Sequence, residues 1–355
     1  MPRKSAARQR TLELIDCQAS GDVSRIVLAG VKPLPGDSVR AQQEYLKTHG
    51  DGLRRLLLSE PYGNPSESVN LIVQPGDDSA QAGYIIMEAM GYPMYSGSNT
   101  ICTVTALLQS GYIPIQASEQ TVLLESPAGI TRIHTHCAEG LVQQVTTQGE
   151  AAYVAVPDLE VDVPRYGRVR YDVVWSGGFY AMVDADTLGF ELVSDEESAL
   201  AAFAHSFVET VRPEFVDNHP EFDHVTPLPF VHFMRALTRV DEHGWRTAGA
   251  TYVHPHVICR SPTGTGTSAR LALLAEHDEI EPEQWLETIS PRGNRFVGTL
   301  IGATAVDGQR GWDTRITGRA WALARSHIVI DLDDPLVDNQ DLEDLLDESA
   351  QESAL

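Results

Sequence analysis

The sequence feature that most constrains the fold is a short motif that occurs twice. Residues 96–100 read Ser-Gly-Ser-Asn-Thr, and residues 263–267, nearly half the chain further on, read Thr-Gly-Thr-Gly-Thr. Each copy opens an apolar stretch with helical character, 99–109 in the first case and 267–276 in the second. Because Ser, Thr and Gly are common helix caps, one copy alone would mean little. Two copies at this spacing favour a duplicated lobe with two equivalent helix N-termini.

Short runs of β-branched and apolar residues, separated by Gly, Pro, Asn and Asp, predict strands joined by turns elsewhere in the chain. The strands are expected at 24–27, 69–73, 121–124, 153–156, 171–175, 179–183 and 327–330. We therefore expect an α+β fold of mostly antiparallel sheet in two pseudo-symmetric lobes. The expected divisions are a first lobe at 10–172, a second lobe at 173–322, a closing strand at 323–335 and an acidic tail at 336–355.

Composition narrows the class of partner. The net charge of −24 argues against binding to phosphate backbones or anionic membranes, so neither nucleic acid nor a membrane is an expected partner. No apolar run has the length of a membrane span, and the N-terminus lacks the apolar core of a signal peptide, so we expect a soluble, cytoplasmic protein. The four cysteines are far apart, which predicts neither a disulfide framework nor a structural zinc site.

Both ends of the chain are expected to be mobile. The last twenty residues hold seven Asp or Glu and no basic or aromatic residue. Residues 341–346 could form a short amphipathic helix, but their charge density favours a solvated tail.

The repeated motif supports a definite chemistry. A helix N-terminus offers unpaired N–H groups and the positive end of a dipole, so it attracts a carboxylate or phosphate. The pattern matches neither a phosphate loop nor a dinucleotide fingerprint, so an amino-acid carboxylate is the preferred ligand. Its α-carbon would then lie between the hydroxyls of Ser96 and Thr263, the candidate catalytic residues. The remaining candidates, for substrate binding, are Gly97, Ser98, Asn99, Cys259, Gly264, Thr265 and Gly266.

These residues resemble the two signatures of the proline racemase family. Residues 260–269, Arg-Ser-Pro-Thr-Gly-Thr-Gly-Thr-Ser-Ala, are similar to the second signature, in which Asp-Arg-Ser-Pro-Cys-Gly-Thr-Gly-Thr is typical. Residues 96–102 are similar to the first, in the version where serine replaces the catalytic cysteine. Weaker matches at 15–25, 34–37, 177–180 and 316–320 extend the likeness over nearly the whole chain.

The resemblance implies a fold like that of diaminopimelate epimerase, with each lobe a sheet wrapped around a helix and the active site between the lobes. It implies a small amino-acid substrate, namely proline or a hydroxyproline. It also implies a reaction without pyridoxal phosphate, metal or nicotinamide, so no cofactor is expected. The expected assembly is a monomer or a homodimer.

Departures from the family pattern bear on the reaction. Racemases and most epimerases of the family use two thiols, whereas the trans-3-hydroxyproline dehydratases have threonine at the second position. This chain has Ser96 and Thr263 and so lacks both thiols. Because an unassisted hydroxyl is a weak base and elimination needs only one proton abstraction, we favour a trans-3-hydroxy-L-proline dehydratase-like lyase. The alternatives are a 4-hydroxyproline 2-epimerase or proline racemase, and a non-catalytic amino-acid-binding relative.

Four further residues have both a functional and an ordinary structural interpretation. Cys259 stands where the family has an aspartate that contacts the substrate ammonium, and an inert buried thiol is favoured over a displaced base. Glu88 could support Ser96, but a solvated glutamate is preferred. His254 and His256 would bind a metal only if a third ligand converged on them.

Overall fold

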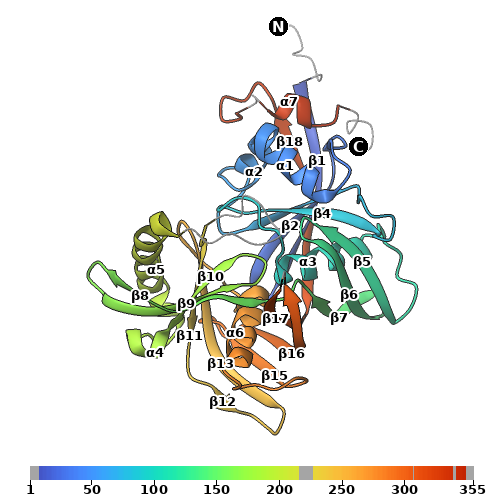
Figure 1. Cartoon of the computed structure of the whole chain (residues 1–355). Helices are drawn as coiled ribbons and strands as arrows, with labels where there is room; N and C mark the ends of the chain where they lie inside the picture. The colour runs from blue at the N-terminus through green and yellow to red at the C-terminus, as the bar shows by residue number, and fades with distance from the viewer. Residues whose placement is uncertain (1–7, 216–226, 307, 339–340, 349–355) are drawn as a thin grey trace.

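The computed structural model describes residues 8–215, 227–306, 308–338 and 341–348, and it has two lobes built on one continuous run of paired strands (Figure 1). The first lobe contains β1 (Gln9–Ala19), β2 (Asp22–Ala29), β3 (Ser68–Val73), β4 (Ala82–Met87), β5 (Glu119–Ser126), β6 (Gly129–Ala138), β7 (Leu141–Gln148) and β18 (Ala320–Asp331), with α1 (Val39–His49), α2 (Asp51–Leu57), α3 (Gly97–Gln109) and α7 (Leu342–Leu345). The α+β class is confirmed.

The second lobe is formed by the middle and later parts of the chain. It contains β8 (Tyr153–Val163), β9 (Gly167–Trp175), β10 (Phe179–Asp184), β11 (Phe230–Met234), β12 (Thr238–Arg239), β13 (Gly244–Val253), β14 (Val257–Ile258), β15 (Trp285–Ile289), β16 (Arg295–Val306) and β17 (Gln309–Gly318), with α4 (Ala185–Leu188), α5 (Glu197–Val211) and α6 (Gly264–Glu276).

The two lobes repeat one order of strand pairing. In the first, β1 to β7 pair in sequence as antiparallel, parallel, antiparallel, parallel, antiparallel and antiparallel. In the second, β9, β10, β11, β13, β15, β16 and β17 repeat that order. The outer partner of β1 is β18, and that of β9 is β8. This repetition is what a duplicated unit produces.

The two helices that the motif opens lie at equivalent places in this pattern, α3 between β4 and β5 and α6 between β13 and β15. Every residue of α3 from 97 to 108 is buried, because the helix is apolar or small on all sides and the sheet surrounds it. Both helices begin slightly before the predicted stretches, with Ser96 and Thr263 as their N-cap residues.

The strand pairing moves the expected lobe boundary. Residue 172 lies inside β9, which pairs with β8 on one side and β10 on the other, so the division cannot fall there. The second lobe begins instead at β8, after β7 ends at Gln148. The strand expected at 323–335 is β18, which starts at Ala320 and pairs with β1.

The expectation of a solvated tail is wrong for residues 341–346. Leu342, Leu345 and Leu346 are buried in the core that α1 and α2 share with β1 and β3. The backbone is also held there, since Lys32 N–H donates to the Leu345 carbonyl at 3.0 Å. Burial of three leucines outweighs the charge density of the acidic residues between them, which stay on the exposed side. The first seven residues and residues 349–355 lie outside the described part of the chain.

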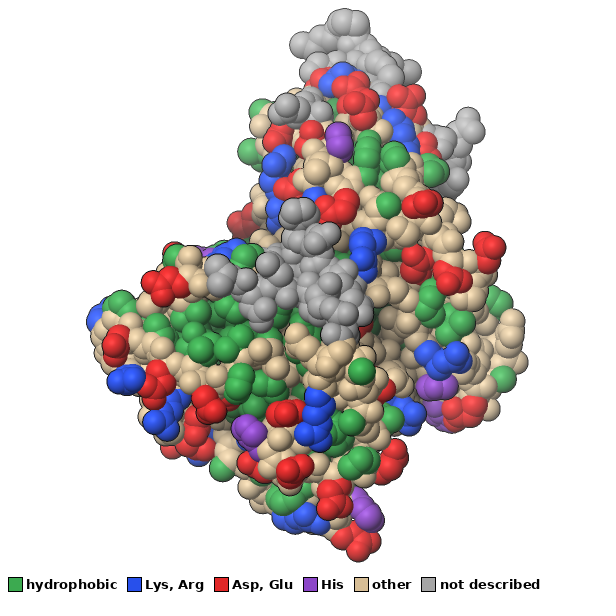
Figure 2. All heavy atoms as spheres, viewed as in Figure 1, with side chains coloured by type: hydrophobic (Ala, Val, Ile, Leu, Met, Phe, Trp, Pro, Cys, Tyr) green, Lys and Arg blue, Asp and Glu red, His purple; other side chains and the backbone are tan. Residues whose placement is uncertain are grey.

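Acidic side chains are spread over both lobes on the face shown in Figure 2, with basic side chains scattered among them. Within the described part of the chain, no helix is long and apolar enough to cross a membrane.

Candidate active site

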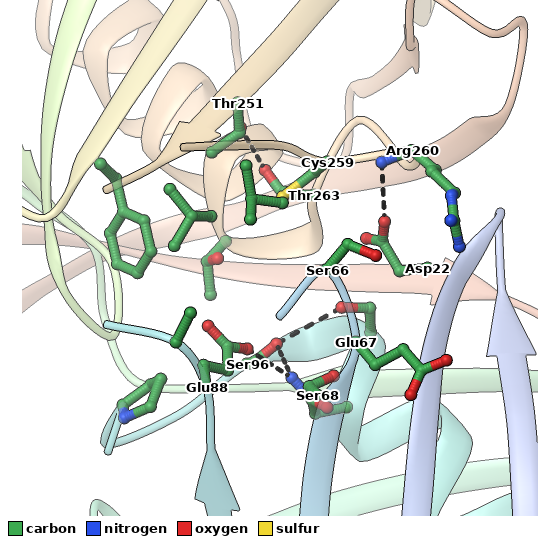
Figure 3. Close-up of a pocket in the computed structure, with 18 of the residues that line it drawn as sticks. Asp22, Ser66, Glu67, Ser68, Glu88, Ser96, Thr251, Cys259, Arg260 and Thr263 are labelled. Carbon is green, nitrogen blue, oxygen red and sulfur yellow. Dashed lines mark hydrogen bonds between the residues drawn. The ribbon is translucent and has the colours of Figure 1, made fainter. Parts of the chain in front are cut away.

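A pocket lies where the two lobes meet, and both N-cap residues line it (Figure 3). The first lobe contributes its wall around Ser96 and Glu88, and the second contributes Thr251, Cys259 and Thr263 from the opposite side. Other lining residues are Asp22, Val23, Pro65, Ser66, Glu67, Ser68, Ala89, Pro93, Tyr95, Ser98, Asn99, Tyr180, Phe230, Val253, Val257, Ile258, Arg260 and Thr265. The repeated motif therefore brings its two hydroxyls to one cavity.

The two helices meet through their glycines. A Cβ atom placed on Gly97 would lie 3.4 Å from the Gly264 Cα, and one placed on Gly264 would lie 3.3 Å from the Gly97 Cα. The first intrahelical bonds are those of Thr100 N–H to the Ser96 carbonyl and Thr267 N–H to the Thr263 carbonyl. The N–H groups before them have no intrahelical acceptor, so two positive helix ends face one region, as an anion site requires.

Ser96 is held by an amide whose orientation is fixed. Asn99 Nδ2 donates to Ser96 Oγ at 2.9 Å and to Glu88 Oε1 at 3.0 Å. Asn99 Oδ1 accepts from Ser24 Oγ at 2.9 Å and from Asn70 Nδ2 at 3.0 Å. The donors on Oδ1 leave Nδ2 directed at Ser96 and Glu88, so one amide group holds a hydroxyl and a carboxyl side by side.

Glu88 is not the solvated residue that the sequence suggested. It follows β4, lines the pocket and is partly buried. The pKa of its carboxyl group is raised to about 7, chiefly by burial; the Asn99 hydrogen bond opposes this shift and the charge of Asp22 adds to it. A carboxyl group that titrates near neutrality can accept a proton from carbon and return it, which suits a general base.

Thr263 differs from its counterpart Ser96 in backbone and bonding. Its φ of +58° lies in the left-handed region, which is unusual for a β-branched residue, whereas Ser96 is extended at −154°. Thr263 Oγ1 accepts from Gly266 N–H at 3.2 Å, donates to the Pro262 carbonyl at 2.8 Å and lies 2.7 Å from Thr251 Oγ1. The protein itself therefore uses most of this hydroxyl's hydrogen-bonding capacity.

Behind Thr263 lies a buried histidine. His232 Nδ1 is 2.8 Å from Thr251 Oγ1, so the three side chains form a row from the pocket into the lobe. Burial first, and then the charge of Arg270, lower the pKa of His232 to about 3. A histidine with so low a pKa stays neutral and accepts protons poorly, so the row orients Thr263 without making it a strong base.

Three carboxyl groups and one guanidinium line the pocket, those of Asp22, Glu67, Glu88 and Arg260. Asp22 also joins the lobes: it accepts from the backbone N–H groups of Arg260 at 2.8 Å and Ser261 at 3.0 Å, and from the Ser261 hydroxyl. Burial raises the pKa of the Cys259 thiol well above its ordinary value, which keeps the thiol protonated.

The candidate residues divide into three groups. Ser96, Ser98, Asn99, Cys259, Thr263 and Thr265 line the pocket. Gly97 and Gly264 form the contact between the helices. Gly266 is not among the residues that line the pocket, and its N–H donates to Thr263 Oγ1.

Sequence reasoning missed Asp22, Thr251 and His232 and dismissed Glu88. A polar residue directly after the buried strand β4 was the available indication for Glu88, since strand ends meet at sites of this kind. The residues that hold Thr263 come from β11 and β13, and only the tertiary pairing brings them together.

Comparison with known proteins agrees with this architecture. The family model for proline racemase matches residues 14–339. A protein of Chromohalobacter salexigens is 50% identical over 340 residues, which cover 96% of this chain and 94% of that protein. The 4-hydroxyproline 2-epimerase of Agrobacterium fabrum is 32% identical over 332 residues, covering 93% and 95% of the two chains.

A solved structure of a hydroxyproline epimerase from Agrobacterium vitis, with bound trans-4-hydroxy-L-proline, superposes with a TM-score of 0.85 at 32% identity, covering 92% of this chain and 94% of that one. A phenazine biosynthesis protein of the PhzF family from Bacillus anthracis shares the fold at a TM-score of 0.55, with 14% identity over 91% of this chain and 99% of that chain. The chain therefore belongs to the proline racemase family. Its relatives with a named activity are enzymes of that family.

Proposed function

We propose that the protein is a cofactor-independent enzyme that removes the α-proton of a proline-like amino acid from the Ser96 side and eliminates water from a trans-3-hydroxyproline. The observation that carries the proposal is the difference between the two faces of the pocket. The Ser96 face has a carboxyl group with a pKa of about 7 next to the hydroxyl. On the other face, the Thr263 hydroxyl contacts the hydroxyl of Thr251, which in turn contacts His232. The pKa of His232 is lowered to about 3.

The substrate would be held by charge at both ends. Its carboxylate fits the N–H groups of the two helix ends, and its ammonium fits a pocket lined by three carboxyl groups. Of these, Asp22 and Glu67 would stand in for the family aspartate whose position Cys259 occupies, while Glu88 acts on the C2 proton. The stacked rings of Tyr180 and Phe230, 4.5 Å apart, offer an apolar wall for the pyrrolidine ring.

One-sided chemistry suits trans-3-hydroxyproline for a stereochemical reason. The C3 hydroxyl is trans to the carboxylate, so it lies on the same ring face as the C2 hydrogen. Glu88, with Ser96 beside it, would take the C2 proton; the C–H electrons form the C2–C3 double bond, and the C3–O bond breaks. The same carboxyl group then protonates the departing hydroxide, giving water and a cyclic enamine with a C2–C3 double bond.

A 4-hydroxyproline 2-epimerase is the second candidate, because named relatives at 31–32% identity carry that activity. Epimerisation needs a proton donor on the opposite face, and Thr263 would have to fill that role. The Thr251 and His232 row would need to deliver the proton.

The deciding experiment is incubation of the full chain with trans-3-hydroxy-L-proline and with the 4-hydroxyproline and proline isomers in heavy water, followed by NMR. We expect water loss from the trans-3 isomer, and α-deuteration without inversion for the others. Formation of the 2-epimer from 4-hydroxyproline without any elimination would favour the second candidate. Tight binding of these amino acids with neither exchange nor product would make the protein a binding relative.

A further inference from the structure

A cluster of metal-ligating side chains lies on the second lobe, outside the candidate active site. One ligand atom from each of His205, Glu209 and His254 can be chosen so that all three lie within 4.8 Å of one another. His205 and Glu209 are one turn apart on the same side of α5, and His254 follows β13. The fold therefore supplies the converging ligands that the His254 and His256 pair lacked in the sequence.

The hydrogen bonds of His205 select the tautomer that binds metals. Its Nδ1 lies 3.2 Å from the Pro255 carbonyl oxygen and 3.3 Å from Tyr252 Oη. Tyr252 Oη donates its own proton to the Pro255 carbonyl at 2.5 Å, so Nδ1 has only acceptors around it and carries the hydrogen. The lone pair then lies on Nε2. A ring whose second nitrogen donates to a backbone carbonyl is the usual arrangement of a metal-bound histidine.

His254 has an unused nitrogen in a confined position. Its side chain is 14% exposed, and its Nδ1 is buried without a hydrogen-bond partner among the described residues. Its Nε2 lies 3.4 Å from Glu209 Oε1, and its ring stacks on that of His205 with the centroids 5.5 Å apart.

We propose that His205, Glu209 and His254 form a site for a divalent transition-metal ion of the zinc class, with a fourth position open to water. Two histidines and one carboxylate are a donor set that zinc accepts, at metal–ligand distances of about 2.0 to 2.2 Å. Tetrahedral geometry at those lengths brings ligand atoms to about 3.4 Å from one another. Glu209, with a side chain that is 58% exposed, can rotate to close the remaining gap.

The ion would tie α5 to the turn between β13 and β14. That turn continues directly into Val257, Ile258 and Cys259, which line the pocket. The metal would therefore stabilise one wall of the candidate active site without contacting the substrate.

The test is titration of the chelator-treated full chain with Zn²⁺ by calorimetry, with Co²⁺ absorption as a probe of tetrahedral ligation. We expect one ion per chain, a rise in the midpoint of thermal unfolding on adding Zn²⁺, and affinity weakened about tenfold or more in His205→Ala and Glu209→Gln. Glu209→Gln keeps the test valid if His205→Ala folds poorly, since Glu209 is exposed.

The matched control is His136→Ala. His136 Nδ1 lies 2.5 Å from Glu119 Oε1 on an exposed strand, a histidine–glutamate pair outside the proposed cluster. Its loss should leave Zn²⁺ binding unchanged. Absence of binding in the wild type, or equal binding by the wild type and Glu209→Gln, would overturn the proposal.

Discussion

Ser96 and Thr263 occupy equivalent positions in a duplicated fold but have different surroundings. Ser96 Oγ accepts a hydrogen bond from Asn99, lies 3.4 Å from Ser98 Oγ and makes no cap to its own helix, so it keeps a second lone pair for a ligand. Thr263 Oγ1 caps α6 through Gly266 N–H and is bonded to its neighbours. A hydroxyl that already serves the protein contributes less to a reaction than one that faces a titrating carboxyl group.

The first prediction follows from that difference. Ser96→Ala should lower α-proton exchange by about a hundredfold or more, since positioned acid–base groups contribute on that scale. Thr263→Ala should leave measurable exchange, and Thr263→Cys should raise epimerisation relative to elimination by restoring a thiol. Exchange is read by NMR in heavy water. If Thr263→Ala is the inactive variant and Ser96→Ala the active one, the two faces have been assigned the wrong way round.

The second prediction concerns Glu88 and pH. With a pKa of about 7, Glu88 loses its proton as the pH rises through neutrality, so the wild-type exchange rate should rise between about pH 6 and 8. Glu88→Gln should be slow at every pH, and the pH dependence should disappear. Glu67→Gln is the control, because Glu67 is another pocket carboxyl group whose pKa burial raises. A flat profile in Glu67→Gln but not in Glu88→Gln would make Glu67 the base.

The raised pKa of Glu88 also makes the free energy of unfolding depend on pH. A carboxyl group whose pKa is higher in the folded state than in the unfolded state binds more protons when folded. Its contribution is therefore full below about pH 4.5 and is lost as the pH rises towards 7. Glu88→Gln should reduce this decline in the free energy of unfolding, which urea titrations at pH 5 and pH 8 would measure.

At the scale of elements, the repeated motif predicted both helix starts because hydroxyl and glycine residues at a cap are local signals. The alternation and β-branching of strands such as β9 and β10 were equally readable. Side chains that come together only when the strands pair could not be predicted in this way. His232 and Thr251 lie on β11 and β13 among buried apolar neighbours, and no local pattern separates a buried polar group that supports Thr263 from an ordinary core residue.

The contact between α3 and α6 gives the third prediction. Alanine at Gly264 would favour the helix by itself, but its Cβ would lie 3.3 Å from both the Gly97 Cα and a methyl group of Ile316. The helices must then move apart, at a cost of roughly 1 to 3 kcal/mol, and the anion site between them widens. We expect Gly264→Ala to lower the unfolding midpoint and raise KM for the amino acid. Gly302→Ala, where the added carbon meets nothing within 4 Å, should change neither. Equal KM values for the two variants would show that the helix contact does not shape the site.

At the scale of the whole molecule, the C-terminal part of the chain packs against the N-terminal part. The last strand, β18, pairs with β1, and the segment after it covers α1 and α2. The sequence of this segment reads as an acidic tail because three leucines are dispersed among carboxylates. The composition of the segment does not reveal that these leucines pack against an apolar surface formed much earlier in the chain, around Leu46 and Leu53.

The fourth prediction tests the packing of the C-terminal leucines against α1 and α2. Leu345 is 4% exposed and lies against Gly50, between α1 and α2, whereas Leu336 is 70% exposed. Leu345→Ala should destabilise the first lobe by about 2 to 5 kcal/mol, as for other buried leucines, and Leu336→Ala should have little effect. If the segment detaches before the lobe unfolds, the measured loss is limited to the free energy of docking, and protease cleavage near residues 341–348 becomes faster while the unfolding midpoint changes little. Urea unfolding and limited proteolysis together separate these cases. Equal behaviour of the two leucine variants in both assays would mean that the acidic tail is solvated after all.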